Sequence, residues 1–209
     1  GLVEPLERRG SAVFTETPVV TIEAVDGGVA VRSVGGGVAR ARHAIVATNG
    51  WPESTLAVPH LRFLSVPYVS HIVVTEPVLG IRERWSGELL WDTYEVYHYL
   101  RLLEDNRILI GGEDRWFGKF YQGSLPGGSR YNRRLIELLR RYFPGFEIRP
   151  SWGWSGYLAD PIDGLPLVET RGAVTSAIVD GLPYGWLIGR LVAERLTEGR
   201  STLDPLYDA

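Results

Sequence analysis

Residues 180–196 read DGLPYGWLIGRLVAERL, a turn with two glycines that runs directly into a predicted helix. Gly181, Pro183 and Gly185 let the backbone of this turn approach a ligand closely. The first N–H groups of a helix have no partner inside the helix, and they carry a partial positive charge. The stretch therefore predicts a site at which a helix N-terminus faces an electron-rich ligand atom.

The residues before this helix predict strands. Residues 154–168 read WSGYLADPIDGLPLV, and residues 169–179 read ETRGAVTSAIV, a hairpin-like stretch. Asp160 and Asp163 are three residues apart and could form an acid/base pair, but a role in the turn around Pro161 and Gly164 is the favoured interpretation.

Residues 11–50 predict a β-meander, with turns at 26–28 (DGG) and 35–37 (GGG). Residues 43–50, HAIVATNG, predict a buried strand that stops in small and polar residues. Such a stop is typical of a strand end at a ligand crevice, although an ordinary exit into a loop has the same pattern.

The middle of the chain predicts long strands and one helix. Residues 63–77 form a long predicted strand in which Pro67 favours an edge position or a bulge. Residues 90–113 predict a hairpin whose alternation places Tyr97, Tyr99 and Arg101 on one face. That face would line a pocket or lie in solvent. Residues 129–142 predict an amphipathic helix.

Composition narrows the function classes. The 209 residues carry a net charge of −3, so the sequence has no electrostatic footprint for nucleic acid. There is no cysteine, which removes disulfides and thiolate metal sites, and no apolar run is long enough for a membrane span. We expect a cytoplasmic protein. The sequence contains no metal, nucleophile or phosphate-loop motif, so any enzymatic chemistry would need a cofactor.

This order of elements predicts an α+β fold. We expect residues 1–59 and 151–209 to form one discontinuous domain, and residues 60–150 to form an inserted domain with a large antiparallel sheet. Residues 2–10, LVEPLERRG, already have the pattern of a helix end, so we expect the chain to be a fragment or a processed product.

Several stretches, in one order, resemble the C-terminal half of FAD-dependent oxidoreductases of the D-amino-acid-oxidase superfamily, in the branch of glycine, sarcosine and gamma-glutamylputrescine oxidases. They include HAIVATNGW, YLRLLEDNRILIGGED, WGWSG, DGLPLV and GLPYGWLIGRLVAERL. The resemblance implies FAD as cofactor and an α/β-type FAD-binding part beside an antiparallel-sheet substrate domain. The Rossmann βαβ unit of the family, with its G-x-G-x-x-G fingerprint, is missing from this sequence, so the remainder of the same protein is an expected partner.

The resemblance also implies positions at the cofactor. A strand valine near the adenine corresponds to Val19, and the strand end near the pyrophosphate corresponds to residues 47–50. The segment near the flavin ring corresponds to positions within residues 154–166, and the last turn corresponds to positions within residues 181–186. The complete set implied is Val19, Ala47, Thr48, Asn49, Gly50, Trp154, Gly156, Gly164, Pro166, Gly181, Pro183, Tyr184, Gly185 and Trp186.

One departure concerns the substrate. Glycine-oxidase-like members hold the substrate carboxylate with an arginine a few residues after W-x-G, and here that place is Leu158. Either the substrate is an amine without an α-carboxylate, or another residue such as Arg101 reads the carboxylate.

The resemblance implies hydride transfer from an amine or amino acid to flavin N5, giving an imine that hydrolyses. Tyr97, Tyr99 and Arg101 are the predicted catalytic residues on the substrate side. The alternative is a non-catalytic β-rich module whose aromatic groove binds a ligand.

Overall fold

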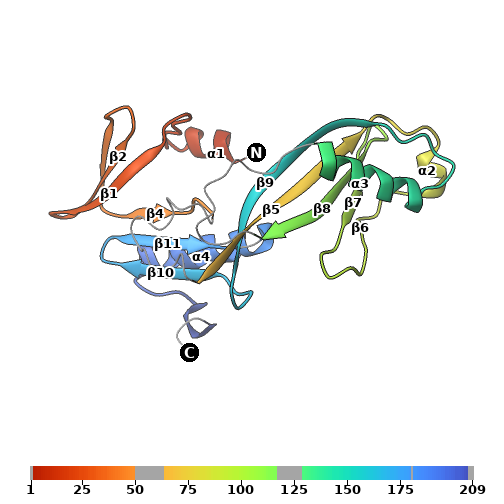
Figure 1. Ribbon diagram of the computed structural model, residues 1–209. Coiled ribbons are helices and arrows are strands. Elements are labelled where there is room, and N and C mark those ends of the chain that lie inside the picture. Colours follow the sequence, from red (N-terminus) through yellow and green to blue (C-terminus); the bar gives the residue numbers. More distant parts are fainter. Residues whose placement is uncertain (1, 50–63, 117–128, 180, 207–209) are drawn as a thin grey trace.

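The computed structural model describes residues 2–49, 64–116, 129–179 and 181–206, and it has two lobes joined by long strands (Figure 1). The helices in these ranges are α1 (Val3–Arg8), α2 (Ile81–Arg84), α3 (Ser129–Tyr142), α4 (Leu182–Glu198) and a short 3-10 helix, η3 (Asp204–Leu206). The strands are β1 (Val19–Val25), β2 (Gly28–Ser33), β3 (Val38–Ala41), β4 (Ala44–Val46), β5 (Ser65–Thr75), β6 (Leu90–Trp91), β7 (Tyr99–Leu102), β8 (Ile108–Trp116), β9 (Pro150–Pro161), β10 (Leu167–Arg171) and β11 (Val174–Ile178).

The first lobe begins with the predicted meander. β1, β2 and β3 pair antiparallel in that order, and Gly27 occupies the first turn at a φ of 75°. α1 ends before Gly10, whose φ of 85° is one that glycine adopts easily. The predicted turns and the predicted helix end are therefore confirmed.

A second, mixed sheet in this lobe has the order β10-β11-β4. β10 and β11 form the predicted hairpin, and β11 runs parallel to β4. Ala177, Ile188, Leu191 and Val192 form a buried core between β11 and the apolar side of α4. The prediction that residues 43–50 form a buried strand is only partly right, because β4 is an edge strand of this sheet in the described part of the chain and Ile45 is 53% exposed.

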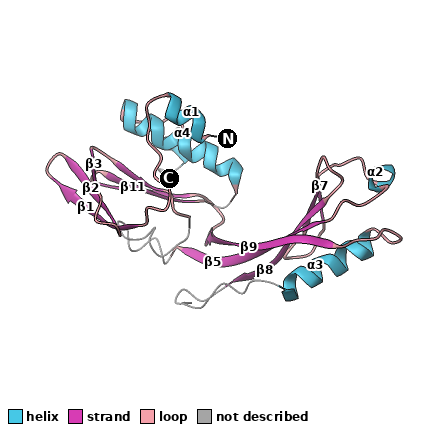
Figure 2. Cartoon of the chain, turned by 90° about the horizontal axis from the view of Figure 1, so that it is seen from above, coloured by secondary structure: helices cyan, strands magenta, loops and turns pink. Residues whose placement is uncertain are grey.

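The second lobe is a five-stranded sheet with the order β6-β7-β8-β5-β9. α3 covers one face of it (Figure 2), and its bounds match the predicted amphipathic helix. The core between α3 and the sheet is built from Val73, Leu100, Leu102, Ile108, Ile110, Leu135, Ile136, Leu139 and Phe143, together with Val78, Ile81, Trp85 and Ile148.

β5 lies in the interior of this sheet, so the expected edge position for Pro67 is wrong. Pro67 pairs with Ala159 of β9, and among the described residues β5 pairs with β8 from Tyr68 to Val74. A bulge between Val69 and His71 follows directly.

β9 connects the two lobes. Its last residues lie beside the small sheet, where Ala159 and Ile178 form a buried contact. The mixture of helices with antiparallel and mixed sheets is an α+β fold, as predicted. No helix in the described ranges is both long enough and apolar enough to cross a membrane.

Candidate functional site

The face of the five-stranded sheet turned away from α3, here called the open face, carries a transverse row of residues. The register aligns Trp91, Tyr99, Gly111, Ile72 and Trp154 across all five strands. Directly paired residues point to the same side of a sheet, so these residues share one face. Trp91 and Trp154 are 66% and 48% exposed.

Tyr99 is held in place on this face. A Cβ on Gly111 would lie 2.1 Å from Cζ of Tyr99, so the phenol ring crosses the strand where Gly111 has no side chain. The Ser70 hydroxyl hydrogen-bonds the phenol, and Ser70 itself is 8% exposed. Burial raises the pKa of Tyr99, and the bond from Ser70 opposes that rise, so the phenol keeps its proton at neutral pH.

Arg101 lies two residues further along β7 on the same face, and it is exposed. Tyr97 lies outside the strand, because β7 begins only at Tyr99. Residues 92–98 form a bend in which Asp92 Oδ1 accepts the backbone N–H of His98 at 2.9 Å. The strand prediction for residues 92–98 is therefore wrong. The Tyr97 ring still lies near the Tyr99 ring, with their centroids 6.4 Å apart.

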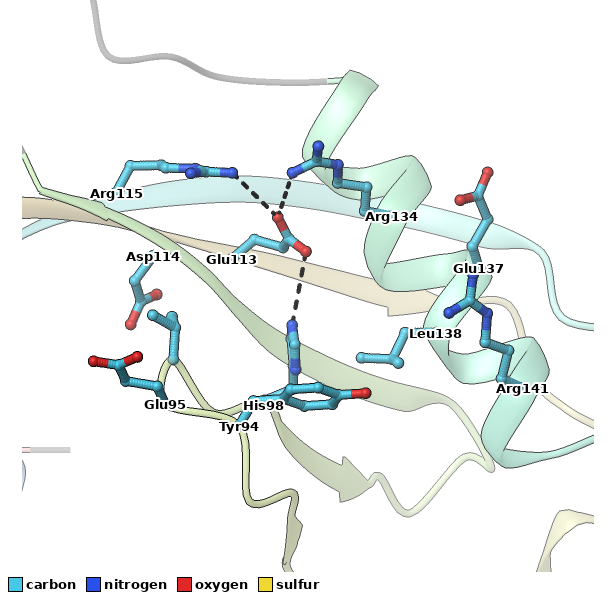
Figure 3. A pocket seen from close by; sticks show the side chains of 11 residues that line it. Tyr94, Glu95, His98, Glu113, Asp114, Arg115, Arg134, Glu137, Leu138 and Arg141 are labelled. Carbon is cyan, nitrogen blue, oxygen red and sulfur yellow. Dashed lines mark hydrogen bonds and ion pairs between the residues drawn. The ribbon is translucent and has the colours of Figure 1, made fainter.

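A cavity of about 580 Å³ lies on the other side of the sheet, between residues 94–98, β8 and α3 (Figure 3). Four of its side chains form one network around Glu113. Glu113 Oε2 accepts from Arg134 at 2.9 Å and lies 3.8 Å from Arg115, and His98 Nε2 lies 3.8 Å from Glu113 Oε1. His98 Nδ1 also contacts Asp92 Oδ2 at 2.7 Å. We assign this cluster to holding the bend against α3, and not to the candidate site.

Three predicted cofactor residues meet elsewhere. Ala47, Asn49 and Gly185 line a cavity of about 300 Å³ between the end of β4, β11 and α4. The rest of its lining is apolar and small, with Ile45, Ala177, Val179, Ile188, Gly189, Val192 and Ala193. The end of the strand and the first turns of the last helix therefore share one concave surface.

Asn49 gives this cavity its polar group. Its φ is 59°, a conformation that asparagine tolerates better than most residues. Its Nδ2 donates to the backbone carbonyl oxygen of Tyr157 at 3.0 Å. Its Oδ1 is buried and accepts no hydrogen bond within the described residues, so this oxygen can accept one from a bound molecule.

The N-terminus of α4 is built as the sequence predicts. Gly181 is the N-cap at a φ of 89°, a proline occupies the first turn, and no side chain caps the helix. Tyr184 and Trp186 are 38% and 69% exposed. The N-cap residue of α4 therefore offers no side-chain acceptor to the first N–H groups of the helix.

The other predicted cofactor positions are spread over both lobes. Val19 begins β1 and is 38% exposed, Ala47 and Thr48 follow β4, and Gly50 lies outside the described residues. Gly156 pairs with Ser70 on the open face. Gly164 forms the turn after β9 at a φ of 73°, and Pro166 is buried beyond it.

The two aspartates of this segment have separate structural roles. Asp163 Oδ1 accepts the backbone N–H of Leu165 at 3.0 Å, and Trp116 Nε1 donates to Asp160 Oδ2 at 3.2 Å. This supports the turn interpretation for Asp163. Leu158, at the place of the family's arginine, pairs with Tyr68 on β5. The described residues contain no cluster of three or more histidine or acidic side chains that could hold a metal ion.

Sequence reasoning missed Ser70 and Gly111. The signal for Gly111 was present, since a glycine inside a strand pattern often marks a close approach of another group. Ser70 gave no such signal, because its partner lies on a strand that is distant in sequence.

Comparison with solved structures defines the class of fold. The chain superposes on L-proline dehydrogenase from P. horikoshii with a TM-score of 0.71 at 19% identity, covering 94% of this chain and 54% of that one. For glycine oxidase from Geobacillus kaustophilus the TM-score is 0.70 at 22% identity, covering 94% and 52%. For NikD, an amino acid oxidase of nikkomycin biosynthesis, it is 0.75 at 15% identity, covering 96% and 56%. The chain therefore has the fold that these three structures share, and it spans about half the length of each.

The family follows from the sequence itself. The family model for FAD dependent oxidoreductases (DAO) matches residues 1–195, so the chain belongs to this family. No curated protein matches the sequence. The cofactor of the family is FAD, and a glycerol-3-phosphate dehydrogenase from Bacillus halodurans with the same fold was solved in complex with it, at a TM-score of 0.66.

Proposed function

We propose that this chain forms part of an FAD-dependent oxidoreductase that oxidises an amine or an amino acid. The observation that carries the proposal is the hydrogen bond from Asn49 to Tyr157. It ties the cavity at the end of β4 directly to β9, the strand that also carries Gly156 and Trp154 on the open face. A cofactor site and a substrate face would thereby be held in one fixed relationship.

The residues of the cavity fit a flavin cofactor. Within the described residues Asn49 Oδ1 is an acceptor without a partner, which suits a hydroxyl or N–H donor of the cofactor. The uncapped N-terminus of α4 suits an electron-rich oxygen. Ala47, Gly185 and the other small lining residues permit close approach. The bound cofactor would accept a hydride from the α-carbon of the substrate.

The chain's own residues would bind and orient the substrate. Tyr99, with its proton retained, would donate a hydrogen bond to the substrate from the open face. Tyr97 would extend the aromatic wall, because its ring lies 6.4 Å from that of Tyr99. Trp154 and Trp186 would exclude water beside the cofactor. The imine product would then hydrolyse in water, and oxygen or another acceptor would take up the electrons.

The substrate class follows from Leu158 and Arg101. An apolar Leu158 cannot form the bidentate arginine–carboxylate pair of the glycine-oxidase pattern. We therefore favour an amine without an α-carboxylate. If the substrate is an amino acid, as for the glycine oxidase and L-proline dehydrogenase neighbours, Arg101 would read the carboxylate.

Two further parts of the proposal concern the protein as a whole. The remaining part of the FAD site would be supplied by residues beyond this chain, as the half-length coverage of the neighbours suggests. The division into residues 1–59 with 151–209 and residues 60–150 remains a prediction, as does a cytoplasmic location.

The test is the cofactor content of the intact gene product. We expect the purified full-length protein to be yellow and to show the visible absorbance bands of an oxidised flavin. These bands should bleach when the amine substrate is added without oxygen. A colourless protein that takes up no added FAD would contradict the proposal. That result would favour the alternative, a ligand-binding module with an aromatic groove.

A further inference from the structure

Ser70 and Gly111 surround the hydroxyl end and the ring of Tyr99 and have no other evident function. Ser70 lies on β5, next to Ile72 on the same face, and pairs with Gly156. Gly111 lies on β8 directly between Tyr99 and Ile72. Tyr99 therefore leans from β7 across β8 toward β5, and this path is possible only because residue 111 is a glycine.

The clearance at Gly111 is small. A Cβ there would be 2.1 Å from Cζ, 2.3 Å from Oη and 2.5 Å from Cε2 of Tyr99. These atoms belong to a rigid ring, so even an alanine would force the phenol to another rotamer. The φ of Gly111 lies outside the positive range, so its backbone conformation does not require a glycine. The space taken by the Tyr99 ring does.

The hydrogen bond places the hydroxyl end of Tyr99. Ser70 is buried, and its hydroxyl hydrogen-bonds the phenol of Tyr99. A serine hydroxyl and a phenol can each donate and accept, so this bond holds Tyr99 Oη beside Ser70 and leaves the phenol a second hydrogen-bonding direction.

We propose that Ser70 and Gly111 are positioning residues for Tyr99, and that together they hold its phenol group on the open face toward the substrate. The inference rests on the proposed function for the identity of the substrate, but not for the geometry of Tyr99. Neither residue touches the substrate itself.

The first experiment measures the phenol without using turnover. Full-length protein labelled with ¹³Cζ-tyrosine is titrated by NMR, and Tyr99→Phe identifies the Tyr99 signal. Removing the Ser70 hydroxyl in Ser70→Ala should raise the pKa of Tyr99 further, while Ser70→Thr, which keeps a hydroxyl, should leave it near the original value. An unchanged Tyr99 titration in Ser70→Ala would overturn the proposal.

The second experiment measures turnover of the flavin-loaded protein with the best substrate among benzylamine, sarcosine, glycine and D-alanine. Loss of one neutral hydrogen bond should reduce kcat/KM of Ser70→Ala by about 3- to 10-fold, and Ser70→Thr should restore most of it. If Ser70 acts through Tyr99, Ser70→Ala should cause no additional loss in a Tyr99→Phe background. Additive losses in the double variant would overturn the positioning role.

Gly111→Ala supplies an independent arm. It should shift the ¹³Cζ signal of Tyr99 and lower kcat/KM more than Ser70→Ala does, because it displaces the whole ring. An unmoved Tyr99 signal in a folded Gly111→Ala protein would overturn the role of Gly111. If no amine is turned over at all, the proposed function fails, and the NMR titration still decides the positioning of Tyr99.

Discussion

Asn49 Nδ2 donates to the backbone carbonyl oxygen of Tyr157 at 3.0 Å, joining residues 108 positions apart in the sequence. The bond links the end of β4 in one lobe to β9 of the five-stranded sheet. Asn49 contributes in two ways, because its side chain forms the bond and its backbone adopts a φ of 59°. A strand end that would hold a cofactor is thus tied to the sheet that would hold the substrate.

Two substitutions separate these contributions. Asn49→Gly keeps the backbone conformation and removes the hydrogen bond, so unfolding in urea should show a loss of about 0.5–1.5 kcal/mol. Asn49→Ala should lose roughly 1 kcal/mol more, because alanine is strained at positive φ. Both should weaken FAD retention in the full-length protein, since both remove Oδ1. Equal stability of the two variants would contradict the backbone part of this account.

His71 predicts a pH dependence of stability. It is fully buried, its Nδ1 is 2.7 Å from Ser155 Oγ, and its ring stacks on Tyr131 with centroids 4.0 Å apart. Burial lowers the pKa of His71 and Arg115 adds to this, while Glu113 opposes it. As the pH falls below about 6.5, the unfolded chain takes up a proton at this position before the folded one does. The free energy of unfolding should therefore fall over that range.

The check is urea unfolding at several pH values between 8 and 5. His71→Phe keeps the stacking on Tyr131 and removes the titration, so its stability should vary less over this range. Ser155→Ala removes the same hydrogen bond but keeps the histidine, so it should retain the slope of the unmodified protein. Identical slopes in all three proteins would exclude His71 as the cause.

Much of the fold could be predicted because its signals are local. The 3.6-residue period of residues 129–142 gave the bounds of α3, and Gly27 and Gly181 marked a turn and a helix start. The family could also be recognised from the order of short stretches, and the match over residues 1–195 confirms it.

What failed depends on contacts distant in sequence or on a side chain that competes with the strand. Residues 92–98 alternate like a strand, but Asp92 accepts the backbone N–H groups of Tyr94 and His98 and bends the chain. Ser70 meets Tyr99 only because β8 lies between their strands with a bulge beyond Gly111. Neither the register nor the bulge can be read from a single strand.

Arg101→Ala tests whether Arg101 binds the carboxylate of a substrate on the open face. If Arg101 binds the carboxylate, loss of a charged hydrogen bond should lower kcat/KM for D-alanine or glycine by roughly tenfold or more. The value for benzylamine should stay within about twofold, since a surface substitution away from any contact costs little.

The matched control is Arg133→Ala, which removes an exposed arginine from α3 on the covered side of the sheet. It should leave both substrate types unchanged. If Arg101→Ala lowers turnover of carboxylate-bearing and carboxylate-free amines equally, Arg101 does not bind a carboxylate, and the Leu158 departure would then favour a simple amine.

Gly156 and Gly153 provide a test of the open face as the cofactor side of β9. Among the described residues, a Cβ at Gly156 would meet only Leu158 Cδ1 at 3.8 Å, an ordinary contact, so Gly156→Ala should leave the free energy of unfolding within about 0.5 kcal/mol. A Cβ at Gly153 would lie 2.2 Å from Asn132 Nδ2 on α3. Gly153→Ala should therefore destabilise the lobe by about 1–3 kcal/mol.

FAD binding should rank the two substitutions in the opposite order to stability. If a flavin lies against the open face near Gly156, the added methyl group should weaken FAD binding or shift the flavin absorbance in Gly156→Ala. Gly153→Ala should alter the flavin only as far as it unfolds the protein. Fluorescence titration of the apoprotein with FAD, read beside urea unfolding, measures both quantities. A Gly156→Ala protein with unchanged stability, FAD affinity and flavin spectrum would show that the cofactor lies away from this part of β9.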